Sequence, residues 1–132
     1  MAGVTGIQPE LWVDRAEAAI DFYTEAFGAT VLHQVGDGDD IVAQLAVDDA
    51  AFWVSAANPE AKRFSPAGLG GGTGRMLLVT EDPDGSFARA LAAGAVAVAP
   101  VADEHGWRLG RLVDPFGHEW EIGRPLGTWP PG

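Results

Sequence analysis

Residues 107–122 read WRLGRLVDPFGHEWEI, and this stretch has the pattern of a β-hairpin with a four-residue turn. Asp114 begins the turn, Pro115 fixes φ near about −65° at the second position, and Gly117 tolerates a positive φ at the end. The stretch therefore predicts two antiparallel strands near the C-terminus, and the rest of the chain is interpreted relative to them.

The strand after the turn has two unlike faces. His118, Trp120 and Ile122 point to one side, whereas Glu119 and Glu121 point to the other. The first face is apolar and should lie on a core, with Trp120 as a core residue. If the second face lines a cavity, Glu121 becomes a candidate for binding or catalysis.

The same order of elements occurs twice along the chain. The first copy predicts a strand, a helix with Asp14 and Glu17 as its capping box, and three strands, at 7–13, 15–27, 30–35, 41–47 and 51–55. The second copy predicts a strand, a helix and three strands at 75–80, 83–93, 96–102, 107–113 and 118–122.

The two copies also agree in length. Gln8 and Trp53 are 45 residues apart, and Arg75 and Glu121 are 46 residues apart. Each module buries little by itself, because its helix covers only one side of its sheet. We therefore predict an α+β fold in which two βαβββ modules pair to form a curved mixed sheet around a cleft.

One domain of residues 1–132 is expected, with module one at 6–56, a connection at 57–73, module two at 74–123 and a Pro/Gly-rich tail at 124–132. The glycine run in the connection is not followed by Lys-Ser or Lys-Thr, so it does not predict phosphate binding. The modules pair either within one chain or between two chains. We expect a homodimer, because each chain leaves a sheet edge or an open cleft that a partner would cover.

Composition excludes several classes of protein. The chain has 19 acidic and 8 basic residues, a net charge of −11, which argues against a nucleic-acid-binding face and favours a cationic ligand. It contains no cysteine, so disulfides and zinc–thiolate sites are excluded. No apolar run approaches a membrane span, and the N-terminus lacks the pattern of a signal peptide, so we expect a cytoplasmic protein.

Two motifs resemble a known family. Residues 18–29, AAIDFYTEAFGA, resemble the first-helix signature of the vicinal oxygen chelate superfamily, which includes glyoxalase I, bleomycin resistance proteins and extradiol dioxygenases. Residues 114–121, DPFGHEWE, are similar to its closing hairpin. The resemblance covers about residues 6–123 and implies the paired βαβββ fold. Because this fold hosts many chemistries, it does not imply one function.

The resemblance also implies positions for a metal. Enzymes of this family commonly hold a divalent cation with one ligand from the first and last strand of each module, and these positions fall on Gln8, Trp53, Arg75 and Glu121. Gln8 and Glu121 have suitable oxygens, but Trp53 cannot ligate, and Arg75 would repel a metal and pair with Glu121. We therefore expect no metal and no cofactor, with Gln8 and Glu121 as the remaining metal candidates.

The histidines do not supply the missing ligands. His33, His105 and His118 fall in different elements, and none is spaced with another for chelation. Trp53 has two interpretations: its indole is either a flat wall of a binding cleft or part of the core. The expected ligand-binding residues are Gln8, Trp53, Arg75, Trp107 and Glu121.

The resemblance is strongest to the bleomycin-resistance-like branch, whose members sequester an antibiotic rather than transform it. The resemblance implies an antibiotic-like small molecule, and Trp53 and the acidic net charge favour a planar aromatic, cationic one. Composition predicts neither nucleic acid nor membrane as partner. The alternative is a metal-dependent glyoxalase, isomerase or dioxygenase that uses Glu121 as base or ligand. A third possibility is a regulatory module that senses a ligand. The sequence does not name the ligand.

Overall fold

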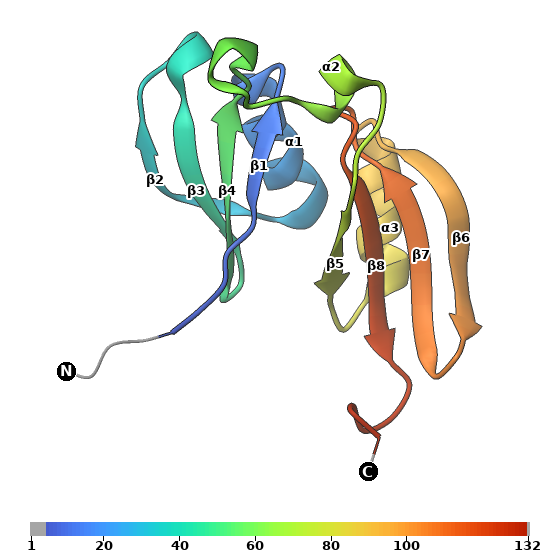
Figure 1. Ribbon diagram of the computed structural model, residues 1–132. Helices are drawn as coiled ribbons and strands as arrows, with labels where there is room; N and C mark the ends of the chain where they lie inside the picture. The colour runs from blue at the N-terminus through green and yellow to red at the C-terminus, as the bar shows by residue number, and fades with distance from the viewer. Residues whose placement is uncertain (1–4, 132) are drawn as a thin grey trace, which may run out of the picture.

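The computed structural model describes residues 5–131 and confirms the prediction of two βαβββ modules (Figure 1). Residues 1–4 and residue 132 lie outside the described part. The expectation that the chain has no signal peptide depends partly on residues 1–4 and is therefore not tested by the structure. Module one contains β1 (Glu10–Val13), α1 (Ala16–Phe27), β2 (Thr30–Val35), a 3-10 turn (Gly38–Asp40), β3 (Val42–Val47) and β4 (Ala50–Ala56). Module two contains β5 (Arg75–Val79), α3 (Pro83–Ala92), β6 (Val96–Glu104), β7 (Trp107–Val113) and β8 (Glu119–Pro125).

The strands form two four-stranded sheets with the same topology. Sheet one has the order β1-β4-β3-β2 and sheet two the order β5-β8-β7-β6. In each sheet the first strand of the module pairs in parallel with the last, and the other pairs are antiparallel. The two open edges of each sheet are therefore its first and second strands in chain order.

The two long helices begin differently. In α3, Asp82 Oδ1 accepts a hydrogen bond from Gly85 N (3.0 Å), as the sequence predicted for a capping aspartate before a proline. In α1 the predicted capping box is wrong, because Arg15 occupies the N-cap position and makes no side-chain cap. Asp14 lies one residue too early, and Glu17 Oε1 instead accepts from Gly38 N (3.3 Å).

The connection between the modules contains structure that the sequence analysis did not predict. A 3-10 turn (Pro59–Ala61) and a short helix, α2 (Pro66–Leu69), interrupt it. The Oγ atom of Ser65 caps α2 by accepting from Gly68 N (3.0 Å), and Gly70 ends it with a positive φ. Ser65 followed by Pro66 is a sequence signal for the start of a helix, but the glycine-rich residues after it do not favour a helix.

Several strand boundaries also differ from the prediction, most of all the start of β1 and the end of β8. β1 begins at Glu10 rather than Ile7, because Pro9 has no N–H to donate, although its carbonyl still accepts from Trp53 N (2.8 Å). β8 continues to Pro125, and the residues after it are held on module two. Leu126 N donates to Gly106 O (2.8 Å), and Trp129 packs edge-to-face on Trp107 with ring centroids 5.3 Å apart.

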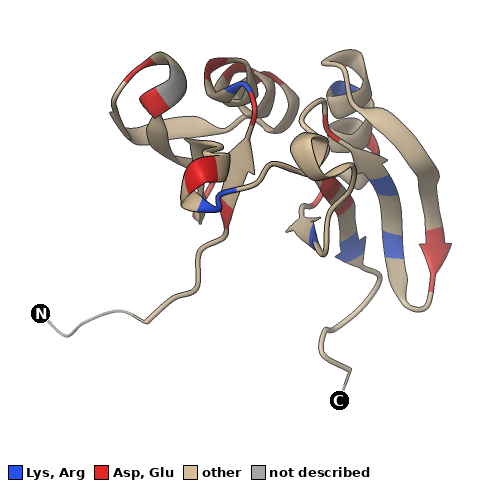
Figure 2. Cartoon of the chain, turned by 45° about the horizontal axis from the view of Figure 1, so that its top comes forward, with Lys and Arg blue, Asp and Glu red and all other residues tan. Residues whose placement is uncertain are grey.

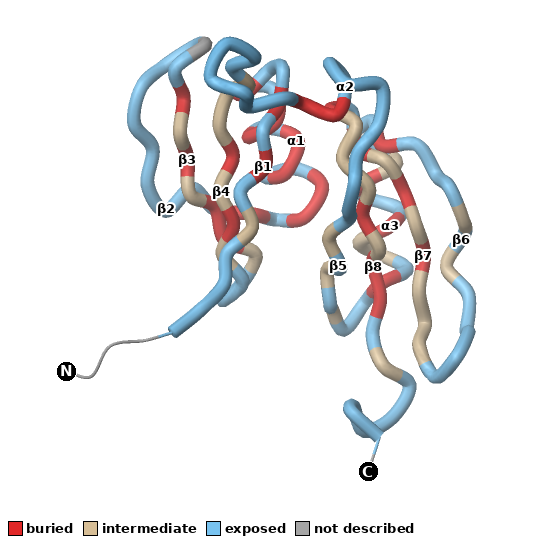
Figure 3. Tube along the Cα trace, viewed as in Figure 1, coloured by how far each residue is buried: buried red, intermediate tan, exposed pale blue. Residues whose placement is uncertain are grey.

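The modules pack through the faces that carry the helices. Tyr23 of α1 contacts Phe52 of β4 and Trp120 of β8, and Phe52 and Trp120 contact each other, with ring centroids 5.4–5.9 Å apart. Trp120 is 5% exposed, which confirms it as a core residue. Figure 3 shows the buried residues concentrated on these facing sides, whereas all of β2 is exposed.

Asp114, at the start of the β7–β8 turn, ties the two modules together. Its carboxylate is 3% exposed and accepts four hydrogen bonds: Oδ2 from the Tyr23 hydroxyl and from Trp120 Nε1 (2.9 Å), and Oδ1 from the backbone N–H groups of Phe116 (2.9 Å) and His118 (3.0 Å). These four donors satisfy the hydrogen-bonding capacity of the buried carboxylate. The predicted turn is confirmed, since Gly117 N donates to Asp114 O and Gly117 has φ 90°.

None of the helices in residues 5–131 is long and apolar enough to cross a membrane.

We predict that Tyr23→Phe lowers the free energy of unfolding by about 2 kcal/mol, because Asp114 Oδ2 loses one of its two donors in a buried site. Urea denaturation measures this. Thr24→Val is the matched control on the same helix, since its hydroxyl bonds only the Ile20 carbonyl within its own helix. An equal loss of stability in both variants would contradict the role given to Tyr23.

The same contact predicts a loss of stability at high pH. Burial and then the Asp114 carboxylate raise the pKa of Tyr23 well above its usual value of 10.0. The unfolded chain ionises its tyrosine near pH 10 but the folded protein does not, so the contribution of Tyr23 to the free energy of unfolding is constant below about pH 10 and then falls by about 1.4 kcal/mol per pH unit. Tyr23 is the sole tyrosine, so tyrosinate absorbance should appear only with unfolding. Ionisation of the folded protein near pH 10 would contradict this.

Candidate ligand-binding site

Each sheet has one face covered by a helix and one open face. In β4, Phe52 and Val54 are buried toward α1 and Trp53 lies on the opposite side; in β8, Trp120 and Ile122 are buried and Glu121 lies on the opposite side. Gln8 and Trp53 therefore belong to the open face of sheet one, and Arg75 and Glu121 to that of sheet two. Because the helix-covered faces meet inside the chain, the two open faces lie on its outside.

On sheet one, Gln8 is bound to two neighbours. Its Oε1 atom accepts from Trp53 Nε1 (2.8 Å) and from Gln44 Nε2 (2.9 Å). Gln44 lies on β3 directly beside Trp53 in the strand register. The sequence analysis did not find Gln44. The alternation of β3, with Ala43 and Leu45 buried, places Gln44 on the open face and is the sequence signal for its position.

On sheet two, both oxygens of Glu121 face arginines. Oε1 lies 3.4 Å from Arg75 Nε, as the predicted pair requires, and Oε2 accepts from Arg111 Nε (3.0 Å). Arg75 Nη1 also lies 3.6 Å from Glu119 Oε1. The network holds two cations and two anions. Arg111 was missed, although the predicted turn fixes the hairpin register that places it opposite Glu121.

The structure does not bring Trp107 to the other predicted residues. It lies at the far end of β7, opposite Pro125 and against Trp129. Arg111, opposite Glu121, is four residues further along the strand, roughly 13 Å away at the rise of a β-strand. Trp107 therefore shares the open face of sheet two with Glu121 but does not touch the arginine–glutamate network.

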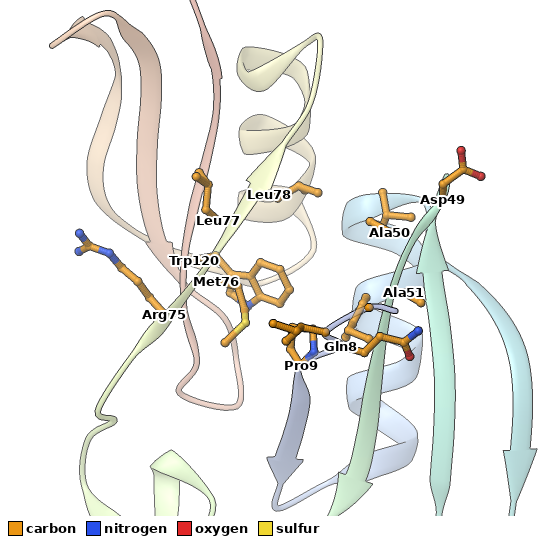
Figure 4. Close-up of a pocket in the computed structure, with 14 residues that line it drawn as sticks. Gln8, Pro9, Asp49, Ala50, Ala51, Arg75, Met76, Leu77, Leu78 and Trp120 are labelled. Atoms are coloured by element: carbon orange, nitrogen blue, oxygen red, sulfur yellow. The ribbon is translucent and has the colours of Figure 1, made fainter. Parts of the chain in front are cut away.

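A pocket of about 510 Å³ lies between the modules, beside the edge strands β1 and β5 (Figure 4). One wall is apolar and comes from Met76, Leu78 and Trp120 of module two. Gln8 and Arg75 both line the pocket, but their polar ends extend away from each other on its two sides (Figure 4). The polar end of Gln8 therefore belongs to the open face of sheet one, and that of Arg75 to the open face of sheet two. The two modules share only the apolar part of the pocket.

The four family positions do not fit a metal ion. Gln8 Oε1 already accepts two hydrogen bonds, Trp53 is a donor, and two guanidinium groups lie on Glu121. Within residues 5–131 no group of three histidine, aspartate or glutamate side chains is placed to hold a cation. A metal would have to displace two arginines from the single carboxylate.

The pairing of Glu121 leaves no free carboxylate oxygen of that residue for a cationic ligand. Arginines lie on β5, β7 and β8, whereas the charged residues of module one are mainly acidic (Figure 2). The Arg108 guanidinium is bound to Asp84 and Asp103 and lowers the pKa of the Asp84 carboxyl. The side chain of Arg75 is 44% exposed and donates no hydrogen bond to any described residue, so it is available to an acceptor on a ligand.

Comparison with known proteins agrees with this architecture. The model of the Glyoxalase/Bleomycin resistance protein/Dioxygenase superfamily matches residues 6–122. An uncharacterized protein of Mycobacterium tuberculosis, Rv0887c, is 39% identical over 126 residues, which cover 91% of this chain and 74% of the relative.

Two solved structures illustrate the likeness in three dimensions. TioX from Micromonospora sp. ML1 is 30% identical with a TM-score of 0.69, over 92% of this chain and 100% of that one. TnmS3, an antibiotic binding protein from Streptomyces sp. CB03234, is 23% identical with a TM-score of 0.70, over 95% and 99% of the two chains. At that identity TnmS3 demonstrates the shared fold alone.

We predict that manganese, nickel or zinc leaves the melting temperature of the protein nearly unchanged. A ligand at a hundredfold excess over its dissociation constant stabilises the folded state by about 2.7 kcal/mol, which a thermal-shift assay would detect. Glu119→Gln, which keeps Glu121 and both arginines, serves as the background control. A saturable rise in the melting temperature at micromolar metal, lost in Glu121→Gln, would show that the family positions hold a metal and would contradict this prediction.

Proposed function

Because the chain belongs to the Glyoxalase/Bleomycin resistance protein/Dioxygenase superfamily, we propose that it binds a small planar aromatic molecule and sequesters it without transforming it. The observation that carries this proposal is the pairing of Glu121 with Arg75 and Arg111. A carboxylate flanked by two guanidinium groups is a poor general base, because Arg111 already donates to Oε2 and Arg75 lies beside Oε1, so a substrate proton has little access to either oxygen. Sequestration needs neither a base nor a metal.

Trp53 is the proposed aromatic wall. Its only polar group, the indole N–H, already bonds Gln8, so the indole offers a flat apolar face without an unsatisfied donor. Stacking on such a face contributes about 0.5–1.5 kcal/mol beyond the area buried. Arg75 would complete the site by donating to a carbonyl, carboxylate or phenolate on the ligand, a chemistry that replaces the cationic ligand expected from net charge.

We further propose that a second copy of the chain completes the cleft. Trp53 and Arg75 lie on two open faces that one chain holds on its outside. Module one of one copy placed against module two of another would bring these faces together. The proposal is supported by exposed apolar side chains at the edges of both sheets: Trp12, Leu77 and Val79 are 37%, 45% and 57% exposed. A homodimer would bury them.

The same fold serves antibiotic binding in TnmS3, which supports an antibiotic-like ligand and a resistance role for this chain as a proposal. The alternative, an enzyme of the glyoxalase, isomerase or dioxygenase type, would require Glu121 to leave both arginines. Enzymatic turnover is therefore one of the outcomes that the binding experiment below must distinguish.

We predict that Trp53→Ala weakens binding of planar aromatic compounds at least about tenfold, since loss of stacking and of buried area together exceeds about 1.4 kcal/mol. Purified protein is titrated with bleomycin, quinoxaline and phenazine compounds while tryptophan quenching is followed. Trp129→Ala is the matched control, because Trp129 is an exposed tryptophan outside both sheets.

The proposed function fails if no compound binds more tightly than about millimolar. It also fails if a glyoxalase or ring-cleavage assay detects turnover that Glu121→Gln abolishes. Equal loss of quenching and affinity in Trp53→Ala and Trp129→Ala would mean that binding occurs elsewhere on the protein.

A further inference from the structure

A row of polar side chains crosses the open face of sheet one. The strand register places His33 of β2 beside Gln44 of β3, Gln44 beside Trp53 of β4, and Trp53 beside Glu10 of β1. Gln8, just before β1, bonds two members of this row. Gln8 and Gln44 form the uncharged centre of the row and lie directly beside the proposed aromatic wall.

The hydrogen bonds fix the orientation of both amides. Gln8 Oε1 accepts from two donors, so its oxygen is directed at Trp53 and Gln44, and its Nε2 group is left for other partners. Gln44 uses Nε2 to reach Gln8, so its Oε1 is left in turn. The reciprocal bond, from Gln8 Nε2 to Gln44 Oε1, does not form between these two described residues. An amide has two donors and an acceptor, and both side chains retain unused capacity.

The unused groups are unlike each other. Gln8 contributes an N–H donor and Gln44 a carbonyl acceptor, and they lie on adjacent side chains next to the indole of Trp53. A ligand group that complements them has a carbonyl acceptor and an N–H donor side by side. Primary carboxamides and lactams have this arrangement, because one N–H lies cis to the carbonyl, whereas esters and carboxylates lack the donor.

We infer that Gln8 and Gln44 select ligands that carry an amide edge next to the aromatic ring. The amide carbonyl accepts from Gln8 Nε2, the amide N–H donates to Gln44 Oε1, and the ring lies on Trp53. This inference rests on the proposed function and adds the chemical class that the aromatic site prefers. Gln8 contributes affinity for any carbonyl next to the ring, whereas Gln44 contributes the preference for an amide over an ester, because only the amide has an N–H to donate.

The test compares two probes of nearly equal size, quinoxaline-2-carboxamide and methyl quinoxaline-2-carboxylate. The amide supplies donor and acceptor, whereas the ester supplies only the acceptor. The wild-type protein should bind the amide about five- to tenfold more tightly, the contribution of one hydrogen bond made in a partly desolvated site. Gln44→Met removes the acceptor at similar length and should reduce this ratio to about one.

Gln8→Glu separates recognition from structure. A glutamate at this position still accepts from Trp53 Nε1 and Gln44 Nε2 but has no N–H to donate, so both probes should bind about tenfold more weakly. Gln34 supplies the matched controls, because it lies on β2 opposite Ala43, which is buried on the other side of the sheet. Gln34→Met and Gln34→Glu should leave both affinities and their ratio unchanged.

Side-chain amide signals provide a readout on the folded protein. Gln8, Gln34, Gln44 and Asn58 are the amide side chains of the sequence, so four pairs of signals are expected in a nitrogen–proton correlation spectrum. Saturating quinoxaline-2-carboxamide should shift the pairs of Gln8 and Gln44 and leave those of Gln34 and Asn58 in place.

The outcomes separate the two proposals. Equal affinity for amide and ester, with binding still dependent on Trp53, overturns the amide preference and leaves the aromatic site standing. Failure of both probes to bind more tightly than about millimolar overturns both proposals. An amide preference that survives in Gln44→Met overturns the assignment of Gln44 as the acceptor.

Discussion

The buried carboxylate of Asp114 is the contact on which the arrangement of the molecule depends. A lone carboxylate in a core is costly, and this one is stabilised by four donors, of which the Tyr23 hydroxyl comes from the other module. The hairpin that begins at Asp114 therefore cannot form its full set of hydrogen bonds unless α1 packs against it. This requirement holds the helix-covered faces together and leaves both open faces outside.

The arrangement of the two modules decides which side chains lie on the open faces. On sheet two, Glu119 and Glu121 lie against Arg75 and Arg111. On sheet one, the amides of Gln8 and Gln44 and the indole N–H of Trp53 form the centre of a row whose outer members are Glu10 and His33. Within residues 5–131, neither face groups three histidine, aspartate or glutamate side chains in a position to hold a cation. Both faces offer hydrogen-bonding groups beside flat apolar surface, which suits recognition of a small molecule.

The sequence predicted the fold well because its signals are local. The turn residues Asp114, Pro115 and Gly117 specify the hairpin, and the repeat of lengths specifies two modules. The Arg75–Glu121 pair followed from the family positions, and Arg111 was readable from the hairpin register. The Tyr23–Asp114 bond was not, because it joins residues 91 positions apart in elements whose packing no local pattern encodes. The capping box of α1 failed for a related reason: Glu17 bonds Gly38 instead.

The central claim, that one ligand site is shared by module one of one copy and module two of another, is tested most directly by complementation. Trp53→Ala and Arg75→Glu chains carrying different affinity tags are co-expressed, and the heterodimer is isolated and titrated with quinoxaline-2-carboxamide. The account predicts that each heterodimer regains one site with wild-type affinity, because one of its two clefts combines the intact halves, whereas both parent homodimers bind weakly. A heterodimer as weak as its parents, or no isolable dimer, would contradict the account.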